Sequence, residues 1–215
     1  MKADVGPGRR VVRRVQAGAG EPAVVLEAGL NNGAASWQRV MPLLAPRLRV
    51  AAYDRAGIGG SAPAPGLVTI DRQVNDLSSV ITGLATGPCV LAGHSWGGML
   101  VQLLAFRRPD LVAGLVLVDP GHEELEGALP LPAQWGWRII NAVFPDVPVV
   151  VLSAARGFPR RFRAHWTRLQ AALVAAAPQG RHVVDGTGHN IPRDRPDAVA
   201  DTILAVAAQA RASGG

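Results

Sequence analysis

The sequence predicts an α/β protein with a doubly wound, mostly parallel sheet. Short runs that are apolar at almost every residue alternate with longer segments that carry apolar residues at helical spacing. Strands without polar and apolar alternation are typical of parallel sheets that helices cover on both faces. The 215 residues are a usual length for one domain, so we expect residues 1–215 to form a single domain.

The expected elements alternate along the chain. We expect strands at 24–28, 48–53, 89–92, 115–118, 148–152 and 182–184. We expect helices at 36–44, 70–84, 96–107, 163–176 and 198–210. Ligands of such sheets bind at the carboxyl ends of the strands, which is where the candidate residues below are expected.

The segment Gly93-His94-Ser95-Trp96-Gly97 lies between a predicted strand and a predicted helix. This G-x-S-x-G pattern is typical of a tight strand-to-helix turn that lifts a serine hydroxyl above the sheet. Its glycines lack β-carbons, so neighbouring chain can pass close to the turn. Ser95 is therefore the candidate nucleophile. The alternative is a glycine-rich turn in which Ser95 only caps the helix.

Five segments share the order and character of a known family. They are Leu26-Glu27-Ala28-Gly29-Leu30, Tyr53-Asp54-Arg55-Ala56-Gly57-Ile58-Gly59-Gly60-Ser61, Gly93-His94-Ser95-Trp96-Gly97-Gly98, Leu117-Val118-Asp119-Pro120 and Gly186-Thr187-Gly188-His189. Over nearly its whole length the chain resembles the α/β-hydrolase superfamily, in particular its small bacterial serine esterases. The resemblance implies an α/β-hydrolase fold with a reduced lid. Epoxide hydrolases and dehalogenases of this fold carry aspartate at the nucleophile position, so Ser95 argues against both.

His189 is the candidate general base. It follows the last predicted strand, and the order serine, acid, histidine is the one that this fold uses. The imidazole would take the Ser95 proton and return it to the leaving group. The alternative is an exposed loop histidine. The remaining histidines, which sit in less suitable positions, are His94, His122, His165 and His182.

The acid of the triad is less sharply defined. The family more often takes it after the strand that ends here at Leu152, where 153–156 contain no carboxylate. Asp119 ends the preceding strand, so we expect it to orient His189 and stabilise the imidazolium. The alternative for Asp119 is a turn residue before Pro120.

Other carboxylates stay open or are given structural roles. Glu123 and Glu124 are the next candidates for the acid, and Asp146 is more remote. Asp54 is expected to pair with a neighbouring arginine or a loop amide, and Asp185 to shape the loop of His189.

Acyl transfer needs two donors aimed at the developing oxyanion. The first is the backbone N–H of Trp96 at the start of the predicted helix. The resemblance implies that the second is the N–H of Leu30, in the loop after the first long strand. The side chain of Asn31 or Asn32 is expected to add a substrate contact. The alternative is that both are loop residues that tolerate unusual backbone angles.

The segment 120–147 is expected to form a short lid. It is rich in apolar residues, and Trp135 or Trp137 is expected to line an acyl pocket. The alternative is that these residues complete the core. A small lid predicts an open site that hydrolyses short acyl esters.

The formal net charge is +6, and Lys2 is the only lysine. Basic chains can bind nucleic acid or anionic membranes. The arginines are scattered, however, and the spacings of nucleic-acid-binding motifs are missing, so we expect no nucleic-acid partner. The densest group is expected to be a solvated helix face or a docking patch for an anionic partner, and it comprises Arg156, Arg160, Arg161, Arg163 and Arg168.

The predicted location is the cytoplasm, without a membrane span. No stretch approaches the roughly 18 apolar residues that cross a bilayer, and 2–15 lacks the apolar core of a signal peptide. Cys89 is the only cysteine, so no intrachain disulfide can form, and it is expected to be a buried, inert thiol. The oligomeric state stays open.

The predicted function is hydrolysis of carboxylic esters of small acyl substrates through an acyl-enzyme. This chemistry needs no metal and no organic cofactor, and we expect neither. The 122–124 segment lacks the second histidine of a zinc helix, and 57–60 is not followed by the lysine of a phosphate-binding loop. One alternative is the same triad acting on lactones, thioesters, peptides or carbon–carbon bonds. The other is a non-catalytic ligand-binding protein of the same fold.

Overall fold

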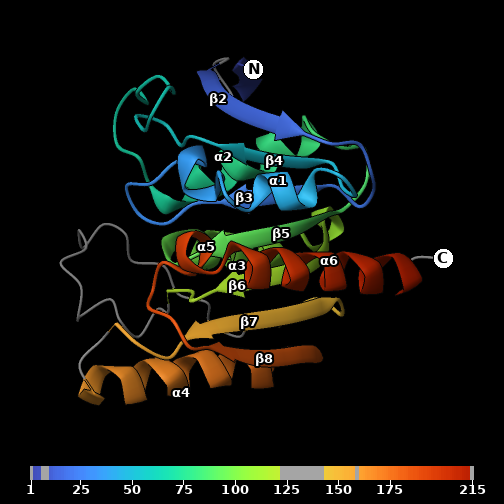
Figure 1. Ribbon diagram of the computed structural model, residues 1–215. Helices are drawn as coiled ribbons and strands as arrows, with labels where there is room; N and C mark the ends of the chain where they lie inside the picture. Colours follow the sequence, from blue (N-terminus) through green and yellow to red (C-terminus); the bar gives the residue numbers. More distant parts are fainter. Residues whose placement is uncertain (1, 6–9, 122–142, 158–159, 214–215) are drawn as a thin grey trace.

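The computed structural model describes residues 2–5, 10–121, 143–157 and 160–213. In these residues eight strands form one sheet in the order β1-β2-β4-β3-β5-β6-β7-β8 (Figure 1). Their bounds are β1 Lys2–Val5, β2 Arg10–Ala17, β3 Val24–Glu27, β4 Val50–Tyr53, β5 Cys89–His94, β6 Val112–Val118, β7 Pro148–Ala154 and β8 Gln179–Asp185. The strands from β3 to β8 run parallel, whereas β1 and β2 pair antiparallel at one edge. The predicted doubly wound, mostly parallel sheet is confirmed.

Helices cover both faces of this sheet (Figure 1). The α-helices are α1 Met41–Leu44, α2 Ile70–Thr82, α3 Trp96–Arg107, α4 Arg160–Ala176, α5 Ile191–Asp194 and α6 Pro196–Ser213. Two short 3₁₀ helices, η1 Ala34–Trp37 and η2 Pro109–Leu111, complete the described elements. None of the described helices is long and apolar enough to cross a membrane.

Alternate residues of the strands supply two apolar layers. Val25 and Leu91 face one layer, with α2 and α3, while Leu26 and Ala92 face the other, with α1 and α6. The strands β3 to β5 are buried along their whole length. Their continuous apolar character therefore reflects burial on both faces.

The strand order changes direction at β3. The chain runs from β3 to β4 on one side and then crosses to β5 on the other side of β3. A crevice outside the carboxyl ends of the strands is expected at such a switch point. The loop after β3 and the turn after β5 meet there, and these segments hold Leu30 and Ser95.

One expectation for the elements was wrong. The helix expected at 36–44 is divided into η1 and α1. Pro42 explains the break, because it has no N–H to donate and its ring clashes with a preceding helical turn. Two further strands, β1 and β2, lie before residue 24, where no element was predicted. The Arg-rich sequence of β2 does not resemble a buried strand, since β2 pairs near the edge of the sheet.

Candidate active site

Ser95 occupies a strained turn between β5 and α3. Its backbone has φ 53° and ψ −117°, left-handed values that cost about 1–3 kcal/mol for a residue with a β-carbon. The Ser95 N–H donates to the carbonyl of Val118 at 3.0 Å, and the Ser95 carbonyl accepts from Gly121 N–H at 2.9 Å. These two bonds join the turn to the end of β6, where Asp119 follows.

Two other residues of the candidate site also have a left-handed backbone conformation. Among the described residues other than glycine, positive φ occurs at Asn31, Ser95 and Asp119. The three residues come from distant parts of the sequence and follow three neighbouring strands, β3, β5 and β6. Residues with such strained backbone cluster at functional sites, where the surrounding structure holds them in place.

Two glycines allow the start of α3 to lie against the end of β3. A β-carbon at Gly97 would overlap the main-chain oxygens of Glu27 and Ala28, and one at Gly93 would overlap the carbonyl of Gly97. The amide of Trp96 therefore lies beside the loop that follows β3. The Trp96 ring is buried, with its Nε1–H donated to Gln73 Oε1 at 3.0 Å.

The carboxylate of Asp119 is fully buried and bonded at both oxygens. Oδ2 lies 2.6 Å from Nδ1 of His189, and Oδ1 accepts from the Ala154 N–H at 3.0 Å and from Trp166 Nε1–H at 2.8 Å. A carboxylate that receives three donors is an acceptor only, so the proton of neutral His189 lies on Nδ1. In that tautomer Nε2 carries the lone pair of the ring.

Of the other carboxylate candidates, only Asp146 lies among the described residues. Asp146 is exposed and accepts from Gln179 Nε2 at 2.9 Å. Glu123 and Glu124 lie outside the described residues, as do Trp135, Trp137 and most of the lid segment 120–147. At the end of β7, Ser153 Oγ lies 2.7 Å from His182 Nε2, and no carboxylate follows.

His94 is a neutral neighbour of His189. The two rings are 4.7 Å apart and tilted by 43°. His94 Nε2 lies 2.8 Å from the main-chain oxygen of His189, which can only accept, so Nε2 carries the His94 proton. Burial, followed by the charge of His189, lowers the pKa of His94 to about 4.

Asp54 and Asp185 stabilise loops, as expected. Asp54 accepts from the loop amides of Ala34 at 2.8 Å and Gly60 at 2.9 Å. Asp185 accepts from the Thr187 N–H at 3.0 Å and the Thr187 hydroxyl at 2.6 Å, which shapes the loop before His189.

A buried arginine that the sequence analysis did not single out holds the loop after β3. Arg55 donates to the main-chain carbonyls of Ala28, Gly29 and Asn32, and it pairs with the fully buried Glu27. Burial raises the pKa of Glu27, and the Arg55 charge opposes that rise. Only the motif of the family pointed to Arg55, because its carbonyl partners cannot be read from a sequence.

The loop itself is partly exposed. Leu30 is 39% exposed, and its carbonyl accepts from Asn32 Nδ2 at 3.1 Å. Asn31 is exposed with φ 57°. Its backbone fits a loop residue that tolerates unusual angles, the alternative stated for it above.

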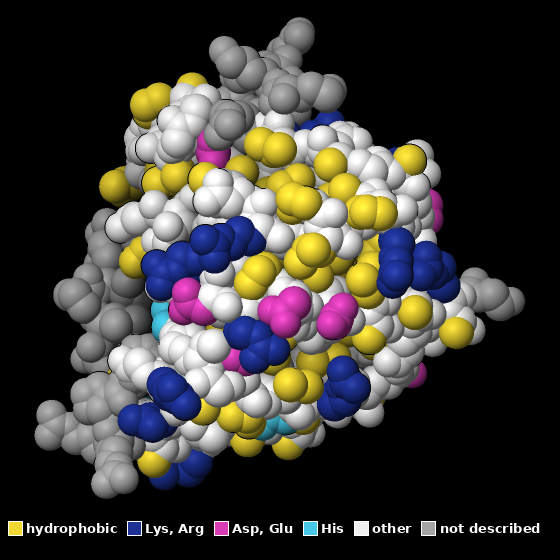
Figure 2. All heavy atoms as spheres, in the orientation of Figure 1, with side chains coloured by type: hydrophobic (Ala, Val, Ile, Leu, Met, Phe, Trp, Pro, Cys, Tyr) yellow, Lys and Arg dark blue, Asp and Glu magenta, His cyan; other side chains and the backbone are white. Residues whose placement is uncertain are grey.

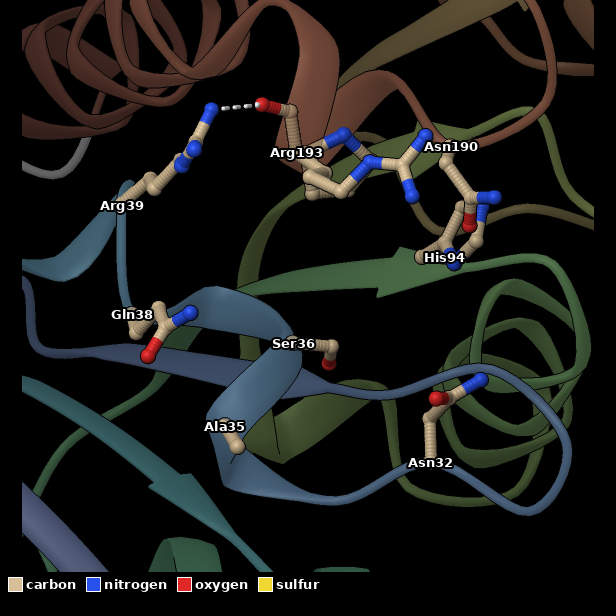
Figure 3. Close-up of a pocket in the computed structure, with 9 residues that line it drawn as sticks. Asn32, Ala35, Ser36, Gln38, Arg39, His94, Asn190 and Arg193 are labelled. Atoms are coloured by element: carbon tan, nitrogen blue, oxygen red, sulfur yellow. Dashed lines mark hydrogen bonds between the residues drawn. The ribbon is translucent and has the colours of Figure 1, made fainter.

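A polar pocket of about 360 Å³ lies beside these residues (Figure 3). It is lined by Asn32, Ala35, Ser36, Gln38, Arg39, His94, Asn190, Pro192 and Arg193. The lining therefore includes Asn32 of the loop after β3 and the chain neighbours of Ser95 and His189.

The arginine group of α4 does not form a single described surface. Arg156 and Arg168 are exposed, whereas Arg163 is partly buried and donates to the carbonyl of Ala155 at 3.0 Å. The side chains of Arg160 and Arg161 are outside the described part. On the face of the molecule that Figure 2 shows, the Lys and Arg side chains lie in separate groups, with acidic side chains between some of them.

Two further predictions concern chemical reactivity. Burial raises the pKa of the Cys89 thiol to about 12, which keeps it protonated, as expected for an inert cysteine. No cluster of three or more metal-ligating side chains was found among the described residues.

The comparison with known proteins identifies the family. The model of the alpha/beta hydrolase fold matches residues 22–181. The chain is 24% identical to the uncharacterized protein YqjL of Bacillus subtilis, over 82% of this chain and 79% of that protein. It is 41% identical to lipase LipV of Mycobacterium tuberculosis over 46% of this chain, but the match spans only 38% of that lipase.

Solved structures agree with that assignment. A hydrolase from Pseudomonas aeruginosa superimposes with a TM-score of 0.76 at 18% identity, covering 96% of this chain and 97% of that one. The order and direction of the strands define the class as an α/β protein with a mostly parallel sheet. The chain belongs to the alpha/beta hydrolase fold family.

Because His94 is buried, we expect the protein to lose stability in acid. Its folded pKa of about 4 lies below the ordinary value, so between pH 6.5 and 4 the unfolded chain binds the extra proton. The free energy of unfolding therefore decreases as the pH is lowered through this window, by about 3 kcal/mol at most for this group. Urea unfolding at pH 7 and pH 4.5 should show a smaller acid loss in His94→Gln than in the wild type.

The control for this measurement is His165→Gln, which replaces a histidine on α4. It should lose stability in acid as the wild type does. An equal acid loss in the wild type and His94→Gln would contradict the assignment.

Proposed function

We propose that the protein is a serine hydrolase that cleaves carboxylic esters of small acyl substrates through an acyl-enzyme. Ser95 is the nucleophile, His189 the general base and Asp119 the acid that orients it. The backbone N–H groups of Leu30 and Trp96 form the oxyanion hole. The proposed substrate is a small molecule, and the proposed location is the cytoplasm, in keeping with a single buried cysteine.

The observation that carries the proposal is the bond between Asp119 and His189. It joins two side chains 70 residues apart at 2.6 Å, with the carboxylate fully buried. Both residues lie at the carboxyl edge of the sheet. The backbone N–H of Ser95 donates to the carbonyl of Val118, the residue before Asp119. A strained serine, a histidine with a fixed tautomer and a buried carboxylate are the parts that acyl transfer requires.

The proposed reaction has two steps. His189 Nε2 takes the proton of the Ser95 hydroxyl as Oγ attacks the ester carbon, and the two N–H donors stabilise the resulting oxyanion. The alcohol leaves with the proton from His189, and the acyl group stays on Ser95. A water molecule then gives its proton to His189 and attacks the acyl carbon, which releases the acid and restores Ser95.

Replacement of the nucleophile tests the whole proposal. The wild type should hydrolyse p-nitrophenyl acetate and butyrate, and Ser95→Ala should lose turnover by at least about a thousandfold while remaining folded. A fluorophosphonate probe should label the wild type and leave Ser95→Ala unlabelled.

Folding is checked by circular dichroism, and Ser78→Ala on α2 serves as a serine control that keeps full labelling. A folded wild type that neither hydrolyses the esters nor reacts with the probe would favour the non-catalytic binding protein instead.

Replacement of Asp119 tests the acid. Asp119→Asn removes the charge that stabilises the imidazolium and no longer fixes the His189 tautomer, so kcat should fall by about 10⁴-fold. Asp146→Asn, which alters an exposed carboxylate, should keep normal turnover with p-nitrophenyl butyrate. Near-normal kcat in folded Asp119→Asn would transfer the role to Glu123 or Glu124.

A further inference from the structure

The pocket beside the candidate site has an unusual charge. Two of its nine lining residues, Arg39 and Arg193, are cationic, and none carries a carboxylate. His94 adds no charge at neutral pH, because burial lowers its pKa to about 4. The remaining polar lining consists of three amide side chains and the Ser36 hydroxyl. The pocket therefore presents positive charge and hydrogen-bond donors.

Both guanidinium groups have acceptors: Arg39 donates to a main-chain oxygen, whereas Arg193 forms an ion pair with Asp194 through Nε. Arg39 Nη1 donates to the main-chain oxygen of Arg193 at 3.1 Å, which ties η1 and the segment after it to α5. Arg193 Nε donates to Asp194 Oδ1 at 2.9 Å. Figure 3 shows the Arg193 side chain reaching toward Asn190 and His94, so its terminal N–H groups lie over the pocket.

The location of the pocket connects it with the proposed reaction. Asn32 belongs to the loop that holds the second oxyanion donor, His94 precedes Ser95, and Asn190 follows His189. A ligand in the pocket therefore lies next to all three candidate segments. A planar guanidinium with paired donors matches the geometry of a carboxylate.

We propose that this pocket is an anion subsite, which binds the carboxylate of a substrate that carries both an ester and a carboxylate. The inference rests on the proposed function for the ester and on Arg39 and Arg193 for the acid group. It adds a substrate class to the proposal: small esters with a negative charge.

The test compares 4-carboxyphenyl acetate with phenyl acetate, which differ by one carboxylate. The ratio of their kcat/KM values is measured for the wild type, Arg39→Gln and Arg193→Gln, so that the intrinsic reactivities of the esters cancel between variants. Loss of one charge-assisted bond should lower this ratio by about tenfold in each variant. Arg181→Gln, which removes the same charge from exposed β8, should keep the wild-type ratio. Ratios within twofold of the wild type for both pocket variants would overturn the subsite.

A binding measurement keeps this test separate from the hydrolase proposal. Calorimetric titration with 4-hydroxybenzoate should give weaker binding to Arg193→Gln than to the wild type or Arg181→Gln. If neither ester is cleaved but this difference persists, the hydrolase proposal fails and the anion subsite stands. If both esters are cleaved and the binding is equal in all three proteins, the subsite fails and the hydrolase proposal stands.

A second inference comes independently from the Arg55 contacts. The Arg55 guanidinium donates to the carbonyl of Gly29, which also accepts from the Asn32 N–H at 3.1 Å. In a planar trans peptide the C=O and the following N–H point in opposite directions. The bond to Gly29 therefore turns the N–H of Leu30 away from Arg55. We infer that Arg55 is the positioning residue for this oxyanion donor, an inference that rests on the proposed function.

The test uses Arg55→Lys, which keeps the charge but loses the forked donor geometry. Misplacement of one oxyanion donor should lower kcat for p-nitrophenyl butyrate about 100-fold and leave KM nearly unchanged. Phenylboronate, whose tetrahedral adduct mimics the oxyanion, should bind correspondingly more weakly. Arg72→Lys, at a half-buried arginine on α2 that donates to the carbonyl of Pro65, is the control and should behave as the wild type.

A second measurement does not depend on the variant folding. The amide proton of Leu30 in the ¹⁵N-labelled wild type should shift downfield when phenylboronate binds, because it donates to the adduct oxygen. A Leu30 amide that does not respond to bound phenylboronate, or Arg55→Lys with unchanged kcat and boronate affinity, would overturn the inference.

Discussion

The candidate site depends on the close approach of α3 to the end of β3. Gly97 has no room for a β-carbon, because the main-chain oxygens of Glu27 and Ala28 occupy that space. This contact sets the Trp96 amide beside the loop after β3 and forces the left-handed backbone of Ser95. Since parallel strands bring their carboxyl ends to one edge, Asp119 and the loop of His189 reach the same place. The contacts between side chains in the site therefore depend on this packing of the main chain.

The buried charges of Glu27 and Arg55 position the loop after β3 more than they stabilise the fold. Taking Glu27 and Arg55 out of water costs free energy that their mutual attraction only partly offsets, so a buried ion pair is a weak source of stability. Each partner has further contacts: Tyr53 donates to Glu27, and Arg55 donates to carbonyls after β3. The pair therefore fixes the course of the loop from inside the protein. The same reasoning applies to Asp119, whose three donors leave its carboxylate a single orientation.

Local patterns in the sequence predicted much of this arrangement, and contacts between distant segments limited the rest. The bounds expected for the helix at 96–107 agree with α3, because the turn before it and Pro109 after it are both local features. Ser95, Asp119 and His189 could be nominated because each follows a strand. The pairing of His189 with Asp119 could be seen only in the structure. The contacts of Arg55 and Arg39 could not be predicted, since both side chains donate to main-chain oxygens far away in sequence.

The two histidines at the site show how environment, rather than residue type, divides the roles. Nδ1 of His189 faces the carboxylate of Asp119, whereas Nε2 of His94 faces the main-chain oxygen of His189. In the proposed reaction, the Asp119 carboxylate would stabilise the imidazolium that forms at His189. A carbonyl in a buried setting does not offset desolvation, and His94 stays neutral with a pKa of about 4. His94 therefore fixes the His189 main chain without competing for the proton, and beside it a positive charge on Arg193 can favour an anionic ligand.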